Sequence, residues 1–371
     1  MTKTIHLSGF VSVVIGMSVL TIFTLTNCGK NADQNKSMPG DSTTVPPGAR
    51  LSKVGIVIHK GDPKAWDGGM VESPSVWYDS VSKRYGLVYT GYALTSPNKT
   101  GYESVSNPHI GLAWSNDLVH WTKSPDNPLF GPSGKEGTPD ETGTSGPLMW
   151  YENGTWYLFY FGLTESGYEK GNKTLNVALS TDMKHWKRYS GNPIIRPEGN
   201  GWRAYAIWHP NIVKKGDTYY LFFNASGVVD GSNEERIGYA TSKDLLHWKV
   251  DDKNSPIVSG SGEKGKWDAR GRAGDPSVYK IGDTWYMAYY SWDGKNSRDG
   301  LAMTDTKHFP LGWKIYSGNP VLDIGSPGSF DALHAGKPFI YITPKRYFHF
   351  YTAVDTSQKR EIALAVWPPL Q

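Results

Sequence analysis

The chain has 371 residues, with 39 Lys and Arg against 35 Asp and Glu, a net charge of +4. That near balance excludes a nucleic-acid-binding protein, which needs clustered excess positive charge. The single cysteine, Cys28, excludes a disulfide framework and a cysteine-based metal site. With 42 Gly, 24 Pro, 15 Trp and 22 Tyr, the composition indicates an all-β chain of short strands joined by turns.

The first residues resemble a bacterial lipoprotein signal. Lys3 gives a positive start, residues 10–25 are almost all apolar, and Cys28 follows shortly. A transmembrane anchor is the alternative, but a 16-residue apolar stretch is short for a span. The resemblance implies that Cys28 is lipidated after removal of the signal. We therefore expect a cell-envelope lipoprotein, at the outer membrane, that meets the membrane only through its lipid anchor.

Three segments follow from this interpretation. Residues 1–28 are the predicted signal peptide, ending at the lipidated cysteine. Residues 29–50 are rich in Lys, Asn, Ser, Pro and Thr, with too few apolar side chains to fold, and are predicted to be a flexible tether. Residues 51–371 are the predicted folded domain.

An internal repeat decides the fold of that domain. Most copies have an aromatic residue followed by Asp, then a proline, then an alternating apolar run that ends in aromatics; the second copy has Asp140 alone and the third has Trp202-Arg203. Each copy offers about four short strands, the content of one propeller blade. The repeat prolines are Pro74, Pro147, Pro210, Pro276 and Pro338.

Five copies predict an all-β, five-bladed β-propeller. The fifth copy ends at residues 363–366 without a fourth strand, whereas residues 54–58 form an apolar strand at the other end of the chain. We expect this N-terminal strand to pair with the last blade and close the ring, which removes exposed sheet edges. A solenoid is the rival architecture, but it needs capping repeats, and none is visible.

A second motif, Ser-x-Asp-x-x-His-Trp, begins at Ser115, Ser180 and Ser242, with a decayed copy near His308. Its His and Asp suggest chemistry, but equivalent places in several blades cannot all line one site. We interpret the motif as a turn-forming Asx cap whose tryptophan packs between blades.

Residues that break the repeat are the candidates for function. They gather just before the repeat proline, where the innermost strand of each blade begins near the mouth of the central channel. Polar groups that converge on a concave mouth are typical of a ligand site. The alternative is that they bond to each other and plug the channel. The set comprises Glu72, Trp208, His209, Asp275, His334 and Lys337.

The blade repeats, the Ser-x-Asp-x-x-His-Trp motifs and the Asp275-Pro276 strand start resemble the five-bladed propeller glycoside hydrolases of families 43, 32/68 and 117. The resemblance covers residues 51–371. In family 43 an Asp base, an orienting Asp and a Glu acid come from the first, third and fourth blades. The matching positions here hold Glu72, His209 and Asp275. Family 117 is proposed to use a His as acid, so a His in this ring is not foreign to the superfamily.

The resemblance implies a glycosidase acting on an oligosaccharide or polysaccharide. Hydrolysis needs an acid at the leaving oxygen and a base or nucleophile at the anomeric carbon. We expect Glu72 and Asp275 to be that pair, across the channel in an inverting geometry, with His209 tuning the acid or binding hydroxyls. Trp208 is expected to stack on a sugar. The further carboxylates held in reserve are Asp67, Asp140 and Glu141.

Basic side chains near the inner strands suggest an anionic sugar, because arginine binds carboxylate and sulfate in bidentate fashion. They are Arg203, Arg270, Arg272 and Lys337. Their pairing with the protein's own aspartates is the alternative. A uronate lyase with His209 as base, and a non-catalytic sugar-binding lipoprotein, are the rival functions. No cofactor is expected; a metal ion on the channel axis, through His209 or His334, is the alternative.

Overall fold

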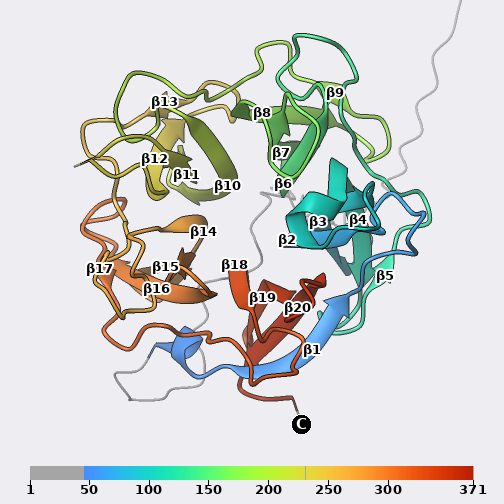
Figure 1. The fold of residues 1–371 in the computed structure, drawn as a ribbon. Helices are drawn as coiled ribbons and strands as arrows, with labels where there is room; N and C mark the ends of the chain where they lie inside the picture. The colour runs from blue at the N-terminus through green and yellow to red at the C-terminus, as the bar shows by residue number, and fades with distance from the viewer. Residues whose placement is uncertain (1–45, 230, 371) are drawn as a thin grey trace, which may run out of the picture.

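A computed structural model describes residues 46–229 and 231–370, which form five blades around a common centre (Figure 1). The first three blades are separate four-stranded antiparallel sheets, and the last two are joined into one eight-stranded sheet by a single parallel bridge between Ser297 and His334. Cys28 and the predicted signal lie outside the described residues. No helix in the described part of the chain has the length and apolar character of a membrane span. The only helices described are short 3-10 turns, η1 (Pro47–Ala49) and η2 (Gly101–Ser104).

The blades follow one another along the chain, each running from an inner strand to a short outer one. Blade one contains β2 (Met70–Asp79), β3 (Arg84–Leu94), β4 (Val105–Ser115) and β5 (Thr122–Lys123). Blade two contains β6 (Gly143–Glu152), β7 (Thr155–Leu163), β8 (Lys173–Ser180) and β9 (Lys187–Arg188). Blade three contains β10 (Ala206–Lys215), β11 (Thr218–Ser226), β12 (Arg236–Ser242) and β13 (Lys249–Val250). Blade four contains β14 (Gly274–Ile281), β15 (Thr284–Trp292), β16 (Ser297–Asp305) and β17 (Lys314–Ile315).

Blade five contains β18 (His334–Ile342), β19 (Tyr347–Val354) and β20 (Arg360–Trp367), and its outer strand is β1 (Ser52–Ile58). β1 pairs antiparallel with β20, as predicted for the N-terminal strand, with Ser52 opposite Val366 and Ile58 opposite Ile362. The two ends of the domain therefore share one sheet.

The start of the domain differs from the prediction. Residues 46–50, expected in the tether, include η1, and Gly48 within it is buried. A side chain at Gly48 would meet the Tyr347 hydroxyl 2.8 Å away, so glycine allows this close approach to blade five. Residues 46–50 thus belong to the folded domain.

Apolar cores lie between successive blades, because both faces of each sheet carry alternating large side chains. Trp77 of β2 packs with Leu158 of β7 between blades one and two. Val71 of β2 shares a core with Phe350 of β19, so blade five also packs on blade one. Burial on both faces explains why the sequence contains so many aromatic residues.

The Ser-x-Asp-x-x-His-Trp motifs are structural, as predicted. In the first copy, Asp117 Oδ1 accepts hydrogen bonds from the backbone N–H groups of Val119 and His120, at 2.9 and 2.8 Å. The motif tryptophans pack on aromatic rings of a neighbouring blade: Trp121 on Phe350, Trp186 on Phe130 and Trp248 on Phe159.

Candidate active site

The residue before each repeat proline has a left-handed backbone. Every inner strand has a register shift at this point, a bulge that accommodates the proline and turns the preceding side chain. One residue from each blade therefore occupies an equivalent position at the channel. The five are Ser73 (φ 55°), Gly146 (57°), His209 (41°), Asp275 (51°) and Lys337 (60°).

This geometry corrects the predicted alignment of the blades. Glu72 was expected to be equivalent to His209 and Asp275, but it lies one residue further from its proline. Its counterpart in blade three is Trp208, and Ser73 is the counterpart of His209. A one-residue difference matters because neighbouring positions in a strand point to different sides.

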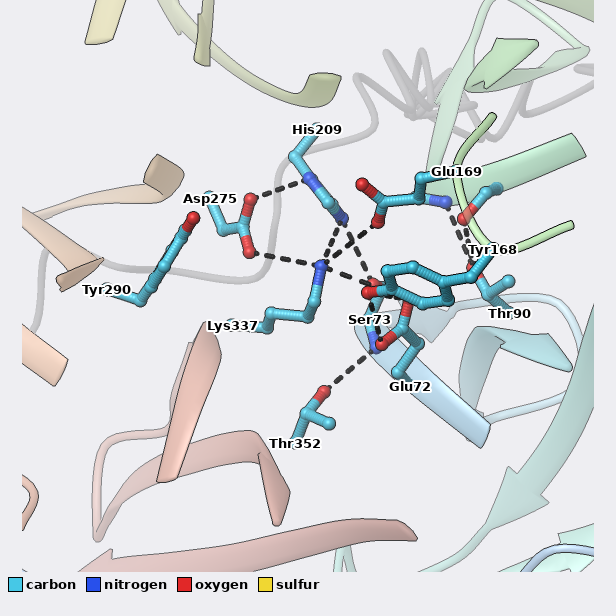
Figure 2. Close-up of polar contacts among 12 residues, drawn as sticks. Glu72, Ser73, Thr90, Tyr168, Glu169, His209, Asp275, Tyr290, Lys337 and Thr352 are labelled. Atoms are coloured by element: carbon cyan, nitrogen blue, oxygen red, sulfur yellow. Dashed lines mark hydrogen bonds and ion pairs between the residues drawn. The ribbon is translucent and has the colours of Figure 1, made fainter. Parts of the chain in front are cut away.

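His209 connects blades one, three and four (Figure 2). Its Nδ1 lies 2.6 Å from Asp275 Oδ1, and its Nε2 lies 3.0 Å from the Ser73 hydroxyl. The order Ser–His–Asp is that of an acyl-transfer triad. Ser73, however, lines a small space of about 30 Å³ among the repeat prolines and does not line the larger cavity. The arrangement therefore orients His209 and does not expose a nucleophile.

Lys337 projects from blade five into the middle of this group (Figure 2). Its Nζ lies 3.4 Å from His209 Nε2, 3.5 Å from Asp275 Oδ2, 3.5 Å from Glu169 Oε1 and 3.9 Å from Glu72 Oε1. The side chain is 15% exposed. One ammonium group is thus shared by three carboxylates and an imidazole.

Glu72 is completely buried and fully occupied by protein partners. Arg360 Nη1 donates to its Oε2 at 2.6 Å, and the Tyr168 hydroxyl lies 3.2 Å from the same oxygen. Burial acts to raise the pKa of Glu72, but Lys337 and Arg360 outweigh it and lower the pKa. Glu72 is therefore an internal counter-ion and does not reach the cavity, contrary to its predicted role as one of the acid–base pair.

Above this floor lies a cavity of about 470 Å³ to which all five blades contribute. Three carboxylates line it, from Glu169, Glu235 and Asp275. The cavity satisfies the expectation of a concave site at the channel mouth, while the bonded residues beneath it fill the channel. Its other polar and aromatic lining includes Tyr168, Trp208, Asn224, Arg272, Tyr290, Trp292, Lys295, His334 and Arg360.

Glu235 lies in the loop between β11 and β12, held from two sides. Its Oε2 accepts hydrogen bonds from Asn224 Nδ2 at 2.7 Å and from the Tyr290 hydroxyl at 2.9 Å. Burial raises its pKa; Arg272 opposes this effect, and the charge of Asp275 adds to it. Glycine at position 274 provides the space for this carboxylate, because a Cβ there would lie 3.0 Å from Glu235 Oε2.

Asp275 has the opposite electrostatic surroundings. Burial acts to raise its pKa, but His209 and Lys337 outweigh that effect and lower it. Two neighbouring carboxyl groups of one cavity therefore have pKa values shifted in opposite directions, the usual arrangement of a general acid and a base.

Some buried polar atoms of the cavity residues have no hydrogen-bond partner among the described residues. They are Trp208 Nε1 and Asn224 Oδ1, while Asp275 Oδ2 has only the contact with Lys337 Nζ at 3.5 Å. Buried polar atoms are normally satisfied, so the Trp208 donor and the Asn224 acceptor are available to a polar ligand or to water.

Other predicted binding residues lie away from the cavity. Asp67 is buried against Lys123 (2.5 Å) and Tyr89, and Asp140 against Arg188 (2.6 Å) and Tyr160. These aspartates tie each blade's outer strand to its second strand. Asp67 and Asp140, predicted as reserve carboxylates of the site, therefore do not line the cavity.

The four predicted cationic side chains do not all lie at the cavity. Arg203 binds Asp252 and Glu198 and does not line the cavity. Arg270 and Arg272 both bind Glu234, at 3.1 and 2.7 Å, and only Arg272 lines the cavity. Of the four cations, only Arg272 and Lys337 are at the site, and both have carboxylate partners.

No group of three or more His, Cys, Asp or Glu side chains within residues 46–229 and 231–370 is arranged to hold a metal ion. The two histidines suggested for an axial metal have separate partners. His209 faces Asp275, and His334 Nδ1 accepts the backbone N–H of Ser297 at 3.0 Å. Burial lowers the pKa of His334 to about 4.

Sequence reasoning missed Tyr168, Glu169, Glu235, Tyr290 and Arg360. All of them lie outside the segment before the repeat proline, in blade loops or in second and third strands. Glu169 did carry a signal, because it lies in the 164–172 loop, which is long compared with the tight turns of the repeat. Their convergence depends on the radial arrangement of the blades and not on sequence spacing.

The sequence and the fold were compared with known proteins. A family model, glycosyl hydrolases family 32 N-terminal domain, matches residues 89–267 and again 145–309. Together the two matches cover residues 89–309, more than half of the chain. Their overlap fits a repeated blade.

Curated relatives match shorter regions. A beta-1,2-mannobiose phosphorylase of Thermoanaerobacter sp. is 28% identical over 123 residues, which is 30% of this chain and 39% of that protein. An extracellular endo-alpha-(1->5)-L-arabinanase of Thermotoga petrophila is 34% identical over 145 residues, 32% of this chain and 30% of that protein. The chain thus spans well under half the length of these relatives.

Solved structures match over most of the chain. One described as a glycoside hydrolase has a TM-score of 0.69 at 20% identity, covering 86% of this chain and 93% of its own length. A thermostable family-43 glycoside hydrolase has a TM-score of 0.58 at 18% identity, covering 82% of this chain and 91% of its own length. These likenesses establish the fold.

Proposed function

The chain belongs to the five-bladed propeller glycosyl hydrolases represented by the family 32 N-terminal domain, and we propose that it hydrolyses glycosidic bonds with Glu235 as general acid and Asp275 as base. The observation that carries this assignment is the opposite pKa shift of two carboxyl groups in one cavity. Asp275 keeps the catalytic role expected from the sequence, and Glu235 replaces Glu72.

The proposed reaction uses each group in the protonation state that its surroundings favour. Protonated Glu235 donates its proton to the leaving glycosidic oxygen. Ionised Asp275 takes a proton from the attacking water or attacks the anomeric carbon itself. Its Oδ2 lies 3.5 Å from the Lys337 ammonium, which favours the ionised carboxylate. The inverting stereochemistry predicted from Glu72 and Asp275 no longer has support, because Glu72 does not line the cavity.

Substrate binding is assigned to the aromatic and polar lining. Trp208 and Trp292 offer apolar faces to a sugar ring, and Asn224 Oδ1 accepts from a hydroxyl. The 470 Å³ cavity lies within the size range of small-ligand sites. This supports an oligosaccharide or the end of a polysaccharide as the substrate.

We also propose that the sugar is negatively charged, but the cation assigned to recognise its charge differs from those that the sequence suggested. Lys295 lines the cavity, and within the described residues no carboxylate lies in ion-pair reach of its ammonium. Arg272 also lines the cavity, but its guanidinium forms ion pairs with Glu234 and Glu235. Lys295 would therefore be the first contact of a uronate or sulfate group.

The proposal is tested by incubating the purified domain with neutral and anionic oligosaccharides and measuring new reducing ends together with ultraviolet absorbance. Reducing ends without absorbance, lost in Glu235→Gln and Asp275→Asn but kept in Glu141→Gln, are expected. Absorbance would identify a lyase, which makes an unsaturated product. Binding without turnover in wild-type protein would identify a sugar-binding protein.

Export and lipid anchoring are proposed on the sequence alone. Metabolic labelling with a fatty acid should mark the wild-type protein and not Cys28→Ala. Label in both proteins would refute lipidation at this cysteine.

A further inference from the structure

Lys337 differs from other lysines that pair with a buried carboxylate in this protein in how it contacts its partners. Lys53, Lys123 and Lys214 each lie 2.5–2.8 Å from one carboxylate, on Asp331, Asp67 and Glu152 respectively. None of the polar contacts of Lys337 is shorter than 3.4 Å, and they come from four different side chains. A short pair fixes two strands together, whereas a shared ammonium acts on a whole group of charges.

The shared position follows from the backbone. Lys337 is the residue before the proline of blade five, and its left-handed conformation (φ 60°) directs it toward the residues from the other blades. The four groups around it come from blade one, the β7–β8 loop of blade two, blade three and blade four. These groups are Glu72, Glu169, His209 and Asp275.

The ammonium also determines which ring nitrogen of His209 carries the proton. An ammonium group can only donate hydrogen bonds, so Nε2 facing it at 3.4 Å acts as acceptor. The ring proton then lies on Nδ1, toward Asp275 Oδ1 at 2.6 Å. Lys337 thus acts on Asp275 twice, by its own charge at 3.5 Å and through the orientation of the imidazole.

We propose that Lys337 is a positioning residue that takes the place of a bound cation on the channel axis and keeps Asp275 ionised and oriented for hydrolysis. The inference rests on the proposed function, because it assigns Asp275 the role of base. It goes beyond that function by naming a built-in cation at the place where the sequence had suggested a metal ion.

The electrostatic surroundings of Asp275 show what removal of this cation would do. Carboxylates face Asp275 from several elements, and each opposes its ionisation when charged. With Lys337 gone, His209 would be the nearest group that favours the carboxylate. The groups that bear on the titration of Asp275 are His209, Lys337, Glu169, Glu235, Tyr290 and Asp299.

The first test is the pH profile of hydrolysis. A base must be ionised, so activity rises as pH increases through the pKa of Asp275. Lys337→Met should move this acidic limb to higher pH by about one unit or more, the size expected for loss of a cation at this distance. Lys337→Arg, which keeps the charge, should leave the limb near its wild-type position. An unchanged limb in Lys337→Met would overturn the proposal.

A control variant separates this effect from the loss of any lysine–carboxylate pair. Lys214→Met removes the pair with Glu152 at 2.8 Å, neither residue of which lines the cavity, and should leave the limb unchanged. In Lys337→Ala, added propylammonium should restore part of the activity and return the limb toward lower pH. Tetramethylammonium, which cannot donate a hydrogen bond, should not. Equal rescue by both ions would contradict the assigned geometry.

A readout without turnover distinguishes failure of this inference from failure of the proposed function. The Asp275 carboxyl can be titrated by NMR in protein with ¹³C-labelled aspartate, its signal assigned with Asp275→Asn. A higher pKa in Lys337→Met supports the inference even if no glycan is cleaved, and equal values overturn it. If Lys337→Met does not fold, Lys337→Gln serves in the same measurement.

Discussion

Buried carboxylates occur in two regions of this propeller, and they are built differently. At the blade edges, Asp67, Asp140 and Asp331 each accept from a tyrosine hydroxyl and pair with one cation at 2.5–2.6 Å. At the channel mouth, Glu235 and Asp275 belong to no repeated pattern, and Asp275 shares its cation with other groups. Recurrence identifies the first set as structural, and the absence of any repeat at the channel mouth is the basis for proposing a functional role for the second.

Blade three sharpens this contrast, because it reverses the charges of the edge pair. Arg203 stands where other blades have the aspartate, and Asp252 provides the opposite charge, 2.7 Å away. The edge position therefore does not require a particular residue; in blade four, Asp268 accepts hydrogen bonds from the Ser261 N–H and hydroxyl where the other blades have an ion pair. At the mouth, by contrast, each blade contributes a different group to one shared cavity.

The largest expected effect separates the two regions by activity. Asp275→Asn and Glu235→Gln should each reduce turnover about 10²–10⁴-fold, the usual contribution of a general acid or base, with little change in melting temperature. Asp140→Asn is the matched control and should retain turnover below its melting point. Equal loss of activity in Asp140→Asn would erase the distinction between mouth and edge.

The next largest effect separates the regions by stability. Asp140→Ala leaves Arg188 and the Tyr160 hydroxyl without their buried acceptor and should cost about 3 kcal/mol in the free energy of unfolding. Denaturant unfolding followed by tryptophan fluorescence measures this. A change below about 0.5 kcal/mol would mean that the edge pairs contribute no more than exposed ones.

A shift in pH dependence tests the acid. Glu235 must be protonated, so activity falls as pH rises through its pKa, which burial raises and Arg272 lowers. Arg272→Met should therefore raise that pKa further and move the alkaline limb of the profile to higher pH by about one unit. Arg203→Met, at the blade edge, should leave the limb in place. Movement of the limb to lower pH would show that Glu235 is not the acid.

The smallest expected effect concerns substrate charge. Lys295→Met should weaken turnover of a uronate- or sulfate-bearing oligosaccharide roughly fivefold through KM, since one exposed ion pair contributes about 1 kcal/mol. Turnover of the neutral counterpart should not change. Equal effects on both substrates would show that Lys295 does not recognise the negative charge of the substrate.

The sequence determined the blades because each repeat carries its own strands, turns and interblade tryptophans, which are local features. It also predicted the pairing of the first strand with the last blade, since residues 54–58 supplied the strand that the fifth repeat lacked. His209, Asp275 and Lys337 were found because they differ from one blade to the next at equivalent positions.

Only the tertiary structure decided which of the polar residues meet. Glu72 lies one residue further from its repeat proline than Asp275 does from its own, and its side chain therefore meets Arg360, from the far end of the chain. Glu169 and Glu235 come from loops of different blades, and nothing in their spacing shows that both face one cavity. The physical reason is that a radial fold brings together residues distant in sequence, so burial and charge at the mouth are properties of all five blades at once.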